Sequence, residues 1–202
     1  SDLEDRMMQQ HICVYCGAAN GLDTAYVETA REAGKAIAQR GHVLVYGGGN
    51  RGLMGEVARA TTEYGGRIIG IIPRMLTDVE QTFSEANKLH ISDGLRDRKS
   101  IMESYASGFL ILPGGLGTLD ELFEILTQKQ LRTLSKPIVL VNTRGYYDPL
   151  VHLFEHIHNQ GFLNGQYPKF YHVAPDALSG IEYIEQYKPV AIESRFQNDS
   201  KA

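Results

Sequence analysis

The sequence predicts an α/β fold, a single three-layer Rossmann-like domain built on a parallel sheet. Short apolar runs typical of buried strands alternate with longer amphipathic segments along the whole chain. Such alternation gives parallel strands joined by right-handed crossover helices that cover both faces of the sheet. The 202-residue length suits one domain with a proper core, and no low-complexity linker or internal repeat divides the chain.

Each element is predicted from its own pattern. The first apolar run, HICVYC, is typical of a buried strand, and the predicted strands cover 11–16, 43–46, 67–72, 109–112, 137–142 and 170–174. In one helical segment Leu119, Leu122, Phe123 and Leu126 recur on one face. The predicted helices cover 24–40, 52–64, 95–106, 118–132, 148–160 and 176–187. We expect a folded domain over 11–190, with tails at 1–10 and 191–202.

Composition excludes several classes of protein. The chain is 43% hydrophobic and 22% charged, which is ordinary for a globular protein. Its net charge of -4 gives no basic field for nucleic acid or an anionic membrane. No apolar run approaches the length of a membrane span, and the first ten residues have no signal-peptide core. We therefore expect a cytoplasmic protein without nucleic-acid or membrane partners.

The two cysteines, Cys13 and Cys16, have C-x-x-C spacing, which raises the possibility of a metal or redox pair. Both fall in a predicted strand, where residues three apart point to opposite faces. No second cysteine pair completes a tetrahedral thiolate site. We interpret them as small buried thiols.

Three loops rich in small residues follow predicted strands, at 15–21, 46–52 and 112–118. In open parallel sheets, ligands bind beyond the carboxyl ends of the strands. Gly47, Gly49 and Gly52 in the second loop spell G-x-G-x-x-G, a dinucleotide fingerprint. However, the motif follows the second strand, and Arg74 rather than a carboxylate lies about 20 residues further on. An NADP site and a purely structural turn both remain open for this loop.

The stretch FLILPGGLGTLDELFEIL, residues 109–126, carries the stronger chemical signal. Gly114, Gly115 and Gly117 form a turn between a strand and a helix. The amide groups at a helix start, with the positive end of its dipole, bind anions. Thr118 and Glu121 also fit a capping box, with Thr118 as the N-cap and Glu121 reaching back to it. A carboxylate held there suits a cationic transition state or an attacking water.

Cations open the preceding helix in DGLRDRKSIMESY, residues 93–105. Arg96, Arg98 and Lys99 lie in its first turns, where positive charge opposes the helix dipole. A solvated basic face is the ordinary explanation for such a run. Because this helix leads directly into the glycine loop, an anionic ligand is the alternative that we favour.

Two further patterns have ordinary explanations. His152, Glu155 and His156 read H-x-x-E-H, an inverted zinc-protease motif, but the segment lies far along the chain from the glycine loops. We interpret it as a polar helix face and expect no metal. A late group of aromatic residues is typical of core and interface positions. Its members are Tyr146, Tyr147, Phe154, Phe162, Tyr167, Phe170 and Tyr171.

These motifs together resemble the LONELY GUY (LOG) family of cytokinin riboside 5′-monophosphate phosphoribohydrolases. The family pattern P-G-G-x-G-T-x-x-E matches residues 113–121 in full, and Arg98-Lys99 matches the Arg-Lys pair. The Tyr46–Gly49 turn with Gly52–Gly55 matches the family's glycine turn, and the similarity covers roughly 11–187. The chain departs from the family at Leu95-Arg96, where Met-His is common, and at Ala18-Ala19, where two serines are common.

The resemblance implies a hydrolase that cleaves the N-glycosidic bond of an adenosine 5′-monophosphate, N6-prenylated or plain, to release base and ribose 5-phosphate. It implies catalytic roles for Glu121, at the oxocarbenium-like sugar and the attacking water, and for Arg98, at the phosphate or the departing base. The implied substrate-binding residues are Gly17, Ala18, Gly47, Gly48, Gly49, Glu80, Lys99, Gly114, Gly115, Leu116, Gly117 and Thr118. It further implies a homodimer and no cofactor. The lysine decarboxylase label often given to the family finds no pyridoxal-phosphate signal here.

Two other functions remain open at this point. A nucleotide or cofactor carrier would use the same glycine cradle without turnover and would not need Glu121. An NADP-dependent oxidoreductase would use the G-x-G-x-x-G loop.

Overall fold

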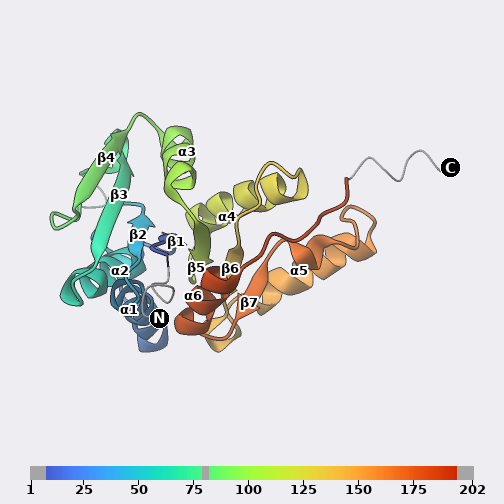
Figure 1. Ribbon diagram of the computed structural model, residues 1–202, viewed down its shortest axis with the longest axis horizontal. Helices are drawn as coiled ribbons and strands as arrows, with labels where there is room; N and C mark the ends of the chain where they lie inside the picture. Colours follow the sequence, from blue (N-terminus) through green and yellow to red (C-terminus); the bar gives the residue numbers. More distant parts are fainter. Residues whose placement is uncertain (1–7, 79–81, 195–202) are drawn as a thin grey trace, which may run out of the picture.

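A parallel seven-stranded sheet forms the centre of the structure, a computed structural model that describes residues 8–78 and 82–194 (Figure 1). The strand order is β4-β3-β2-β1-β5-β6-β7. The strands are β1 (His11–Tyr15), β2 (Val43–Tyr46), β3 (Arg67–Pro73), β4 (Lys88–Ser92), β5 (Gly108–Ile111), β6 (Ile138–Val141) and β7 (His172–Ala174). The predicted parallel α/β fold is confirmed.

Six α-helices pack on the sheet in the described part of the chain, and each predicted helix is present to within two residues at its ends. They are α1 (Thr24–Gln39), α2 (Gly52–Glu63), α3 (Leu95–Tyr105), α4 (Leu116–Gln130), α5 (Asp148–Asn159) and α6 (Ala177–Gln186). The sequence prediction missed one element, the edge strand β4. Its sequence KLHIS is mostly exposed and polar, whereas β2, β5 and β6 are buried throughout. An edge strand with solvent on it lacks the continuous apolar run on which the prediction depended.

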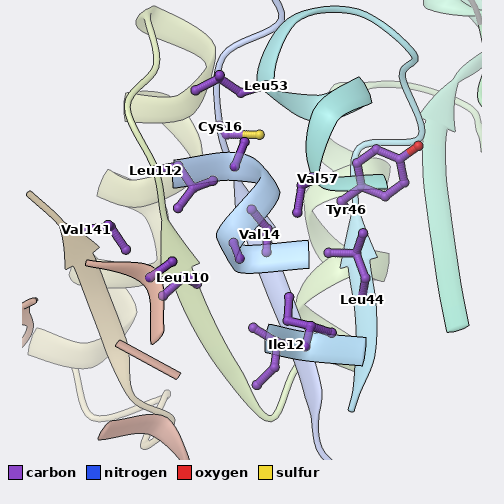
Figure 2. Close-up of a cluster of buried hydrophobic side chains, with 14 of the residues drawn as sticks. Ile12, Val14, Cys16, Leu44, Tyr46, Leu53, Val57, Leu110, Leu112 and Val141 are labelled. Atoms are coloured by element: carbon purple, nitrogen blue, oxygen red, sulfur yellow. The ribbon is translucent and has the colours of Figure 1, made fainter. Parts of the chain in front are cut away.

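Two hydrophobic clusters lie on opposite faces of the sheet and define the three layers. Alternate residues of β1 divide between them: Ile12 and Val14 join the cluster of α1, α2 and α6, and Cys13 and Tyr15 join that of α3, α4 and α5. Figure 2 shows the first cluster around the central strands. Cys16, beyond the end of β1, belongs to the cluster opposite that of Cys13, so the two thiols are buried apart, as the strand geometry predicted.

The strand order reverses direction beside β1. The chain proceeds outward from β1 through β2 and β3 to β4, then returns to the other side of β1 as β5 and proceeds outward again. The loops after β1 and β5 therefore diverge to opposite faces and leave a crevice between them, which is the usual ligand position in open α/β sheets.

No helix in the described part of the chain is both long enough and apolar enough to cross a bilayer.

Candidate active site

A cavity of about 280 Å³ opens at the carboxyl ends of β1, β2 and β5, where the strand order reverses. It is built from the loops after these strands and from side chains of α2, α3 and α4. Its lining residues are Val14, Tyr15, Cys16, Gly17, Ala18, Ala19, Gly47, Met54, Arg98, Gly115, Gly117, Thr118 and Glu121.

The glycine-rich loop after β2 is packed tightly against the loop after β1. The N–H groups of Leu53 and Met54 donate to the Gly17 carbonyl at 3.0 and 3.3 Å, and the Gly52 N–H donates to Asn20 Oδ1 at 3.0 Å. A Cβ on Gly52 would lie 2.5 Å from the Ala18 carbonyl carbon. The amides that a pyrophosphate would need at the start of α2 are therefore occupied by protein oxygens. These contacts favour the structural interpretation of the G-x-G-x-x-G motif over an NADP site.

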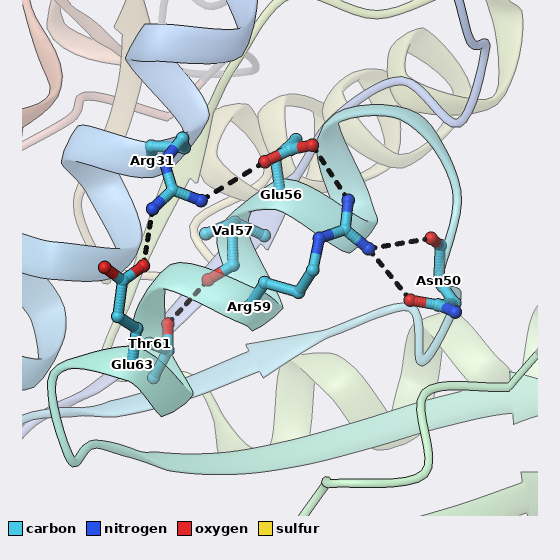
Figure 3. A network of polar contacts seen from close by, with 7 residues as sticks. All are labelled: Arg31, Asn50, Glu56, Val57, Arg59, Thr61 and Glu63. Atoms are coloured by element: carbon cyan, nitrogen blue, oxygen red, sulfur yellow. Dashed lines mark hydrogen bonds and ion pairs between the residues drawn. The ribbon is translucent and has the colours of Figure 1, made fainter.

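Charged side chains of α2 hold the same loop from the other side (Figure 3). Arg59 donates to both the carbonyl and Oδ1 of Asn50, at 3.2 and 2.9 Å. Glu56 accepts from Arg59 at 2.9 Å and from Arg31 of α1 at 3.4 Å. The Tyr46 hydroxyl also donates to the Gly49 carbonyl at 3.0 Å. The network fixes the loop as a rigid wall of the cavity.

Helix α4 begins at Leu116 with Gly115 as its N-cap, two residues before the predicted start. The capping-box prediction is therefore wrong: Thr118 lies within the first turn, is 3% exposed, and Gly115 makes no side-chain cap bond. The helix continues back through Gly117 because glycine tolerates the helical conformation, although at a cost in free energy. The first amides of a helix have no intrahelical partner, and the N-cap Gly115 has no side chain to satisfy them in α4. Three residues at this helix start, Gly115, Gly117 and Thr118, line the cavity.

Gly114 requires its small size for a different reason. A Cβ on this residue would lie 2.1 Å from Thr118 Oγ1. The turn before α4 thus closes onto the helix itself, and its neighbour Gly115 is left lining the cavity.

Arg98 of α3 is 7% exposed and reaches under the ends of two strands. Its Nε donates to the Ile71 carbonyl at 3.0 Å, and one terminal nitrogen donates to the Gly47 carbonyl at 2.5 Å. A Cβ on Gly47 would meet this guanidinium at 2.2 Å, so the glycine admits the arginine into the cavity wall. Arg98 lies near the start of α3, where a positive charge opposes the helix dipole. From this position its side chain places the charge at the cavity wall.

In α4, Glu121 lies one turn after Gly117 and Thr118 and on the same face of the helix. Its charge acts on the end of β1. Burial raises the pKa of the Cys16 thiol far above its usual value, the Glu121 charge raises this pKa further, and Arg98 opposes the shift. Glu121 and Arg98 therefore both lie near the end of β1, and both line the cavity with Cys16.

Known proteins are similar to this chain over nearly its whole length. A family model described as "Possible lysine decarboxylase" matches residues 54–184. A cytokinin riboside 5′-monophosphate phosphoribohydrolase LOG of Oryza sativa subsp. japonica is 39% identical, over 92% of this chain and 77% of that protein. LOG5 of Arabidopsis thaliana, also a cytokinin riboside 5′-monophosphate phosphoribohydrolase, is 36% identical, over 90% of this chain and 79% of that protein. The chain belongs to the LOG family.

Solved structures show the same fold as this LOG-family chain. A molybdenum cofactor binding protein from Rippkaea orientalis has a TM-score of 0.66 at 21% identity, over 89% of this chain and 97% of that one. A molybdenum cofactor carrier protein from Chlamydomonas reinhardtii has a TM-score of 0.66 at 22% identity, over 88% of this chain and 97% of that one. At these identities the likeness extends to the fold alone.

Most residues of the LOG-family motifs meet in the cavity, but some lie elsewhere. Gly48 packs on β3, and Gly49 pairs with Thr82 outside the lining. Lys99 binds Asp120 at 3.0 Å and Glu124 at 2.8 Å, which ties α3 to α4. Gly114 lies behind the lining, Leu116 is 86% exposed at the helix start, and Glu80 lies outside the described residues.

Sequence reasoning missed five lining residues, Val14, Tyr15, Cys16, Ala19 and Met54. Met54 follows the glycine turn on α2, and a Cβ on Gly47 would contact its Cε at 2.4 Å. The only sequence signal was position, since Tyr15, Cys16 and Ala19 lie within the 15–21 loop, and Val14 and Met54 lie within two residues of a loop already singled out.

The alternative metal motif gains no support from the LOG-family structure. His152 and His156 lie on an exposed face of α5. Among the described residues, no group of three or more histidine, cysteine or acidic side chains is arranged to hold a metal ion. None of the described residues that line the cavity is a lysine, the residue type to which pyridoxal phosphate is linked as a Schiff base.

Proposed function

We propose that the protein hydrolyses the N-glycosidic bond of adenosine 5′-monophosphate, with or without an N6 substituent, and releases free base and ribose 5-phosphate. The observation that carries this proposal is the meeting of Glu121, Arg98 and the uncapped start of α4 in one cavity. The phosphoribohydrolase activity of the rice and Arabidopsis relatives supports it.

The 5′-phosphate is assigned to the start of α4. Gly115, Gly117 and Thr118 line the cavity there, and their amides with the helix dipole suit an anion. Glu121 follows Gly117 by four helical residues, about 6 Å along the axis, which is the scale of the ribose between phosphate and glycosidic carbon. Arg98 lies toward the ends of β2 and β3, on the far side of the β1 loop. A nucleotide bound across β1 would place its sugar at Glu121 and its base toward Arg98.

This placement accounts for the chemistry. The bond from C1′ to the base nitrogen breaks, and its electron pair leaves with the base. The sugar passes through an oxocarbenium-like state that the Glu121 carboxylate stabilises. Water adds to C1′, and the carboxylate orients it and accepts its proton. The fixed Arg98 charge stabilises the negative charge that develops on the base until the base is protonated from water.

The decisive experiment is incubation of the protein with AMP and with N6-prenylated AMP, followed by separation of free base. Glu121→Gln is expected to lower the rate of base release at least about 10²–10⁴-fold, as loss of a positioned acid–base group does. Its affinity for AMP should remain close to that of the unsubstituted protein. Asp120→Asn is the matched control, since it removes the adjacent carboxylate, which binds Lys99 at the surface.

The outcomes separate the candidate functions. Tight binding of both nucleotides without base release from the unsubstituted protein would refute hydrolysis and support a carrier. Equal loss of activity in Glu121→Gln and Asp120→Asn would refute the assigned role of Glu121. The ratio of rates on the two substrates identifies the preferred N6 group.

We also propose that the protein acts in the cytoplasm as a homodimer that forms through α4 and α5. Between these helices lies an apolar groove of about 170 Å³ whose lining includes Phe123, Leu126, Phe154 and Phe170. Phe162 beyond α5 is 81% exposed, and exposed apolar surface of this kind is typical of interfaces. The molar mass in solution tests this assignment, and Phe123→Arg should shift it to the monomer value.

A further inference from the structure

The loop between β6 and α5 directs two consecutive tyrosines at the turn before α4. The Tyr146 hydroxyl donates to the Gly114 carbonyl at 2.5 Å, and the Tyr147 hydroxyl donates to the Leu112 carbonyl at 2.5 Å. These bonds span 32 and 35 residues of sequence, so the fold rather than local geometry creates them. Tyr147 is 1% exposed, whereas Tyr146 is 38% exposed.

The neighbouring carbonyls of the same turn are occupied as well. The Pro113 carbonyl accepts from the Gly17 N–H at 3.0 Å, and the Gly115 carbonyl accepts from the Leu119 N–H at 3.1 Å. Four successive carbonyls, from Leu112 to Gly115, thus face protein donors. No carbonyl of this turn is left to repel an anion in the cavity.

The orientation of one peptide unit follows directly from the Tyr146 bond. In a trans peptide the carbonyl and the next N–H point in opposite directions. Because the Gly114 carbonyl is held by Tyr146, the Gly115 N–H is directed away from Tyr146. Gly115 lines the cavity beside the start of α4, where the phosphate is assigned. Glycines on both sides of this peptide would otherwise let it rotate with little steric resistance.

The tyrosine loop is itself held in an uncommon conformation. Arg144 and Gly145 are consecutive residues with positive φ, 54° and 70°. A non-glycine residue in this region costs about 1–2 kcal/mol. Asn142 offsets this by bonding at both ends of its amide: Oδ1 accepts from the Tyr147 N–H at 2.7 Å, and Nδ2 donates to Asp148 Oδ1 at 2.8 Å. Such strain is maintained where a loop must aim particular side chains.

We propose that Tyr146 is a positioning residue of the phosphate site, and that its hydroxyl orients the Gly114–Gly115 peptide so that the Gly115 N–H is presented to the 5′-phosphate. The inference rests on the proposed function, because it takes a 5′-phosphate as the anion at α4. Tyr147 has a different role. Burial raises the pKa of its hydroxyl well above the usual range, so it remains a neutral donor that stabilises the strand end.

The test compares AMP with adenosine, which differ in the phosphate alone. In Tyr146→Phe the affinity advantage of AMP over adenosine should fall about tenfold, as for one lost bond to a charged group. Adenosine affinity and the melting temperature should be unchanged, and KM for AMP should rise more than kcat falls. Tyr64→Phe is the matched control, because Tyr64 is 40% exposed and lies at the far end of α2.

Two results would overturn the inference. One is an equal advantage of AMP over adenosine in Tyr146→Phe and in the unsubstituted protein. The other is an equal loss of affinity for AMP and adenosine in the variant, which would mean a general structural role. The binding measurement needs no turnover, so it decides the role of Tyr146 even if the unsubstituted protein releases no base. Base release by the unsubstituted protein decides the proposed function separately.

Discussion

At the scale of single residues, Arg98 combines a structural and a chemical task. It is nearly fully buried and donates to two backbone carbonyls, that of Ile71 in β3 and that of Gly47 just after β2. The planar fork of a guanidinium makes both contacts while leaving its charge at the cavity wall. A lysine of similar length would carry the charge as a single point and could not reproduce this geometry.

The substitution Arg98→Lys is therefore expected to lower both stability and activity. Loss of one buried hydrogen bond partner should reduce the free energy of unfolding by about 1–3 kcal/mol. Base release should fall at least about tenfold, because the charge is no longer fixed opposite Glu121. Denaturant unfolding and the base-release assay measure these effects. The exposed neighbour Arg96 gives the control Arg96→Lys, and an equal effect of both substitutions would contradict the assignment.

At the scale of elements, the loops after β1 and β2 act as one interlocked unit. Gly52 has a φ of +55° and no room for a side chain against Ala18, whereas Gly41 has a φ of +74° and open space around it. Both glycines need the left-handed conformation, so comparing them separates backbone strain from close packing.

Replacement by alanine should affect these two glycines differently. Gly41→Ala should lower the free energy of unfolding by about 1–2 kcal/mol through backbone strain alone. Gly52→Ala should add a further loss of about 1–3 kcal/mol from the clash and should impair AMP binding. Thermal or chemical unfolding gives the stability difference, and similar losses for both variants would show that the loops are not interlocked.

The elements also show how far sequence patterns reach. Buried parallel strands and amphipathic helices were predictable because each carries its own periodicity, and so were the glycine turns at their ends. The edge strand β4 was not predictable, because its mostly exposed residues do not form a continuous apolar run. The start of α4 was misplaced because Gly115 and Gly117 have no helical propensity to reveal it. The hydroxyl contacts of Tyr146 and Tyr147 depend on a loop far away in sequence, so the residues were assigned only to core and interface.

At the scale of the whole molecule, one buried cation links stability to pH. Lys129 of α4 is 2% exposed, and its Nζ donates to the Lys136 carbonyl at 2.6 Å and to the Tyr187 hydroxyl at 2.9 Å. Burial lowers its pKa from 10.5 to about 8. Between these values the unfolded chain binds more protons than the folded one, so the contribution of Lys129 to stability rises with pH.

The difference in unfolding free energy between the unsubstituted protein and Lys129→Met should isolate this contribution. From pH 8 to pH 10.5, the unfolding free energy of the unsubstituted protein should rise by about 3 kcal/mol relative to that of Lys129→Met. The subtraction is needed because burial raises the pKa of Cys13 and of Tyr15, which lowers total stability over the same range. Urea unfolding at several pH values measures it, and a pH-independent difference would contradict the assignment.

The opposite burial of the two thiols has a practical consequence. Three residues of extended chain span about 10 Å, beyond the roughly 7 Å within which two cysteines can be bridged. Cys13 and Cys16 also pack into different hydrophobic clusters with the sheet between them. Dissolved oxygen therefore cannot cross-link the native chain internally, and purification should succeed without a reducing agent.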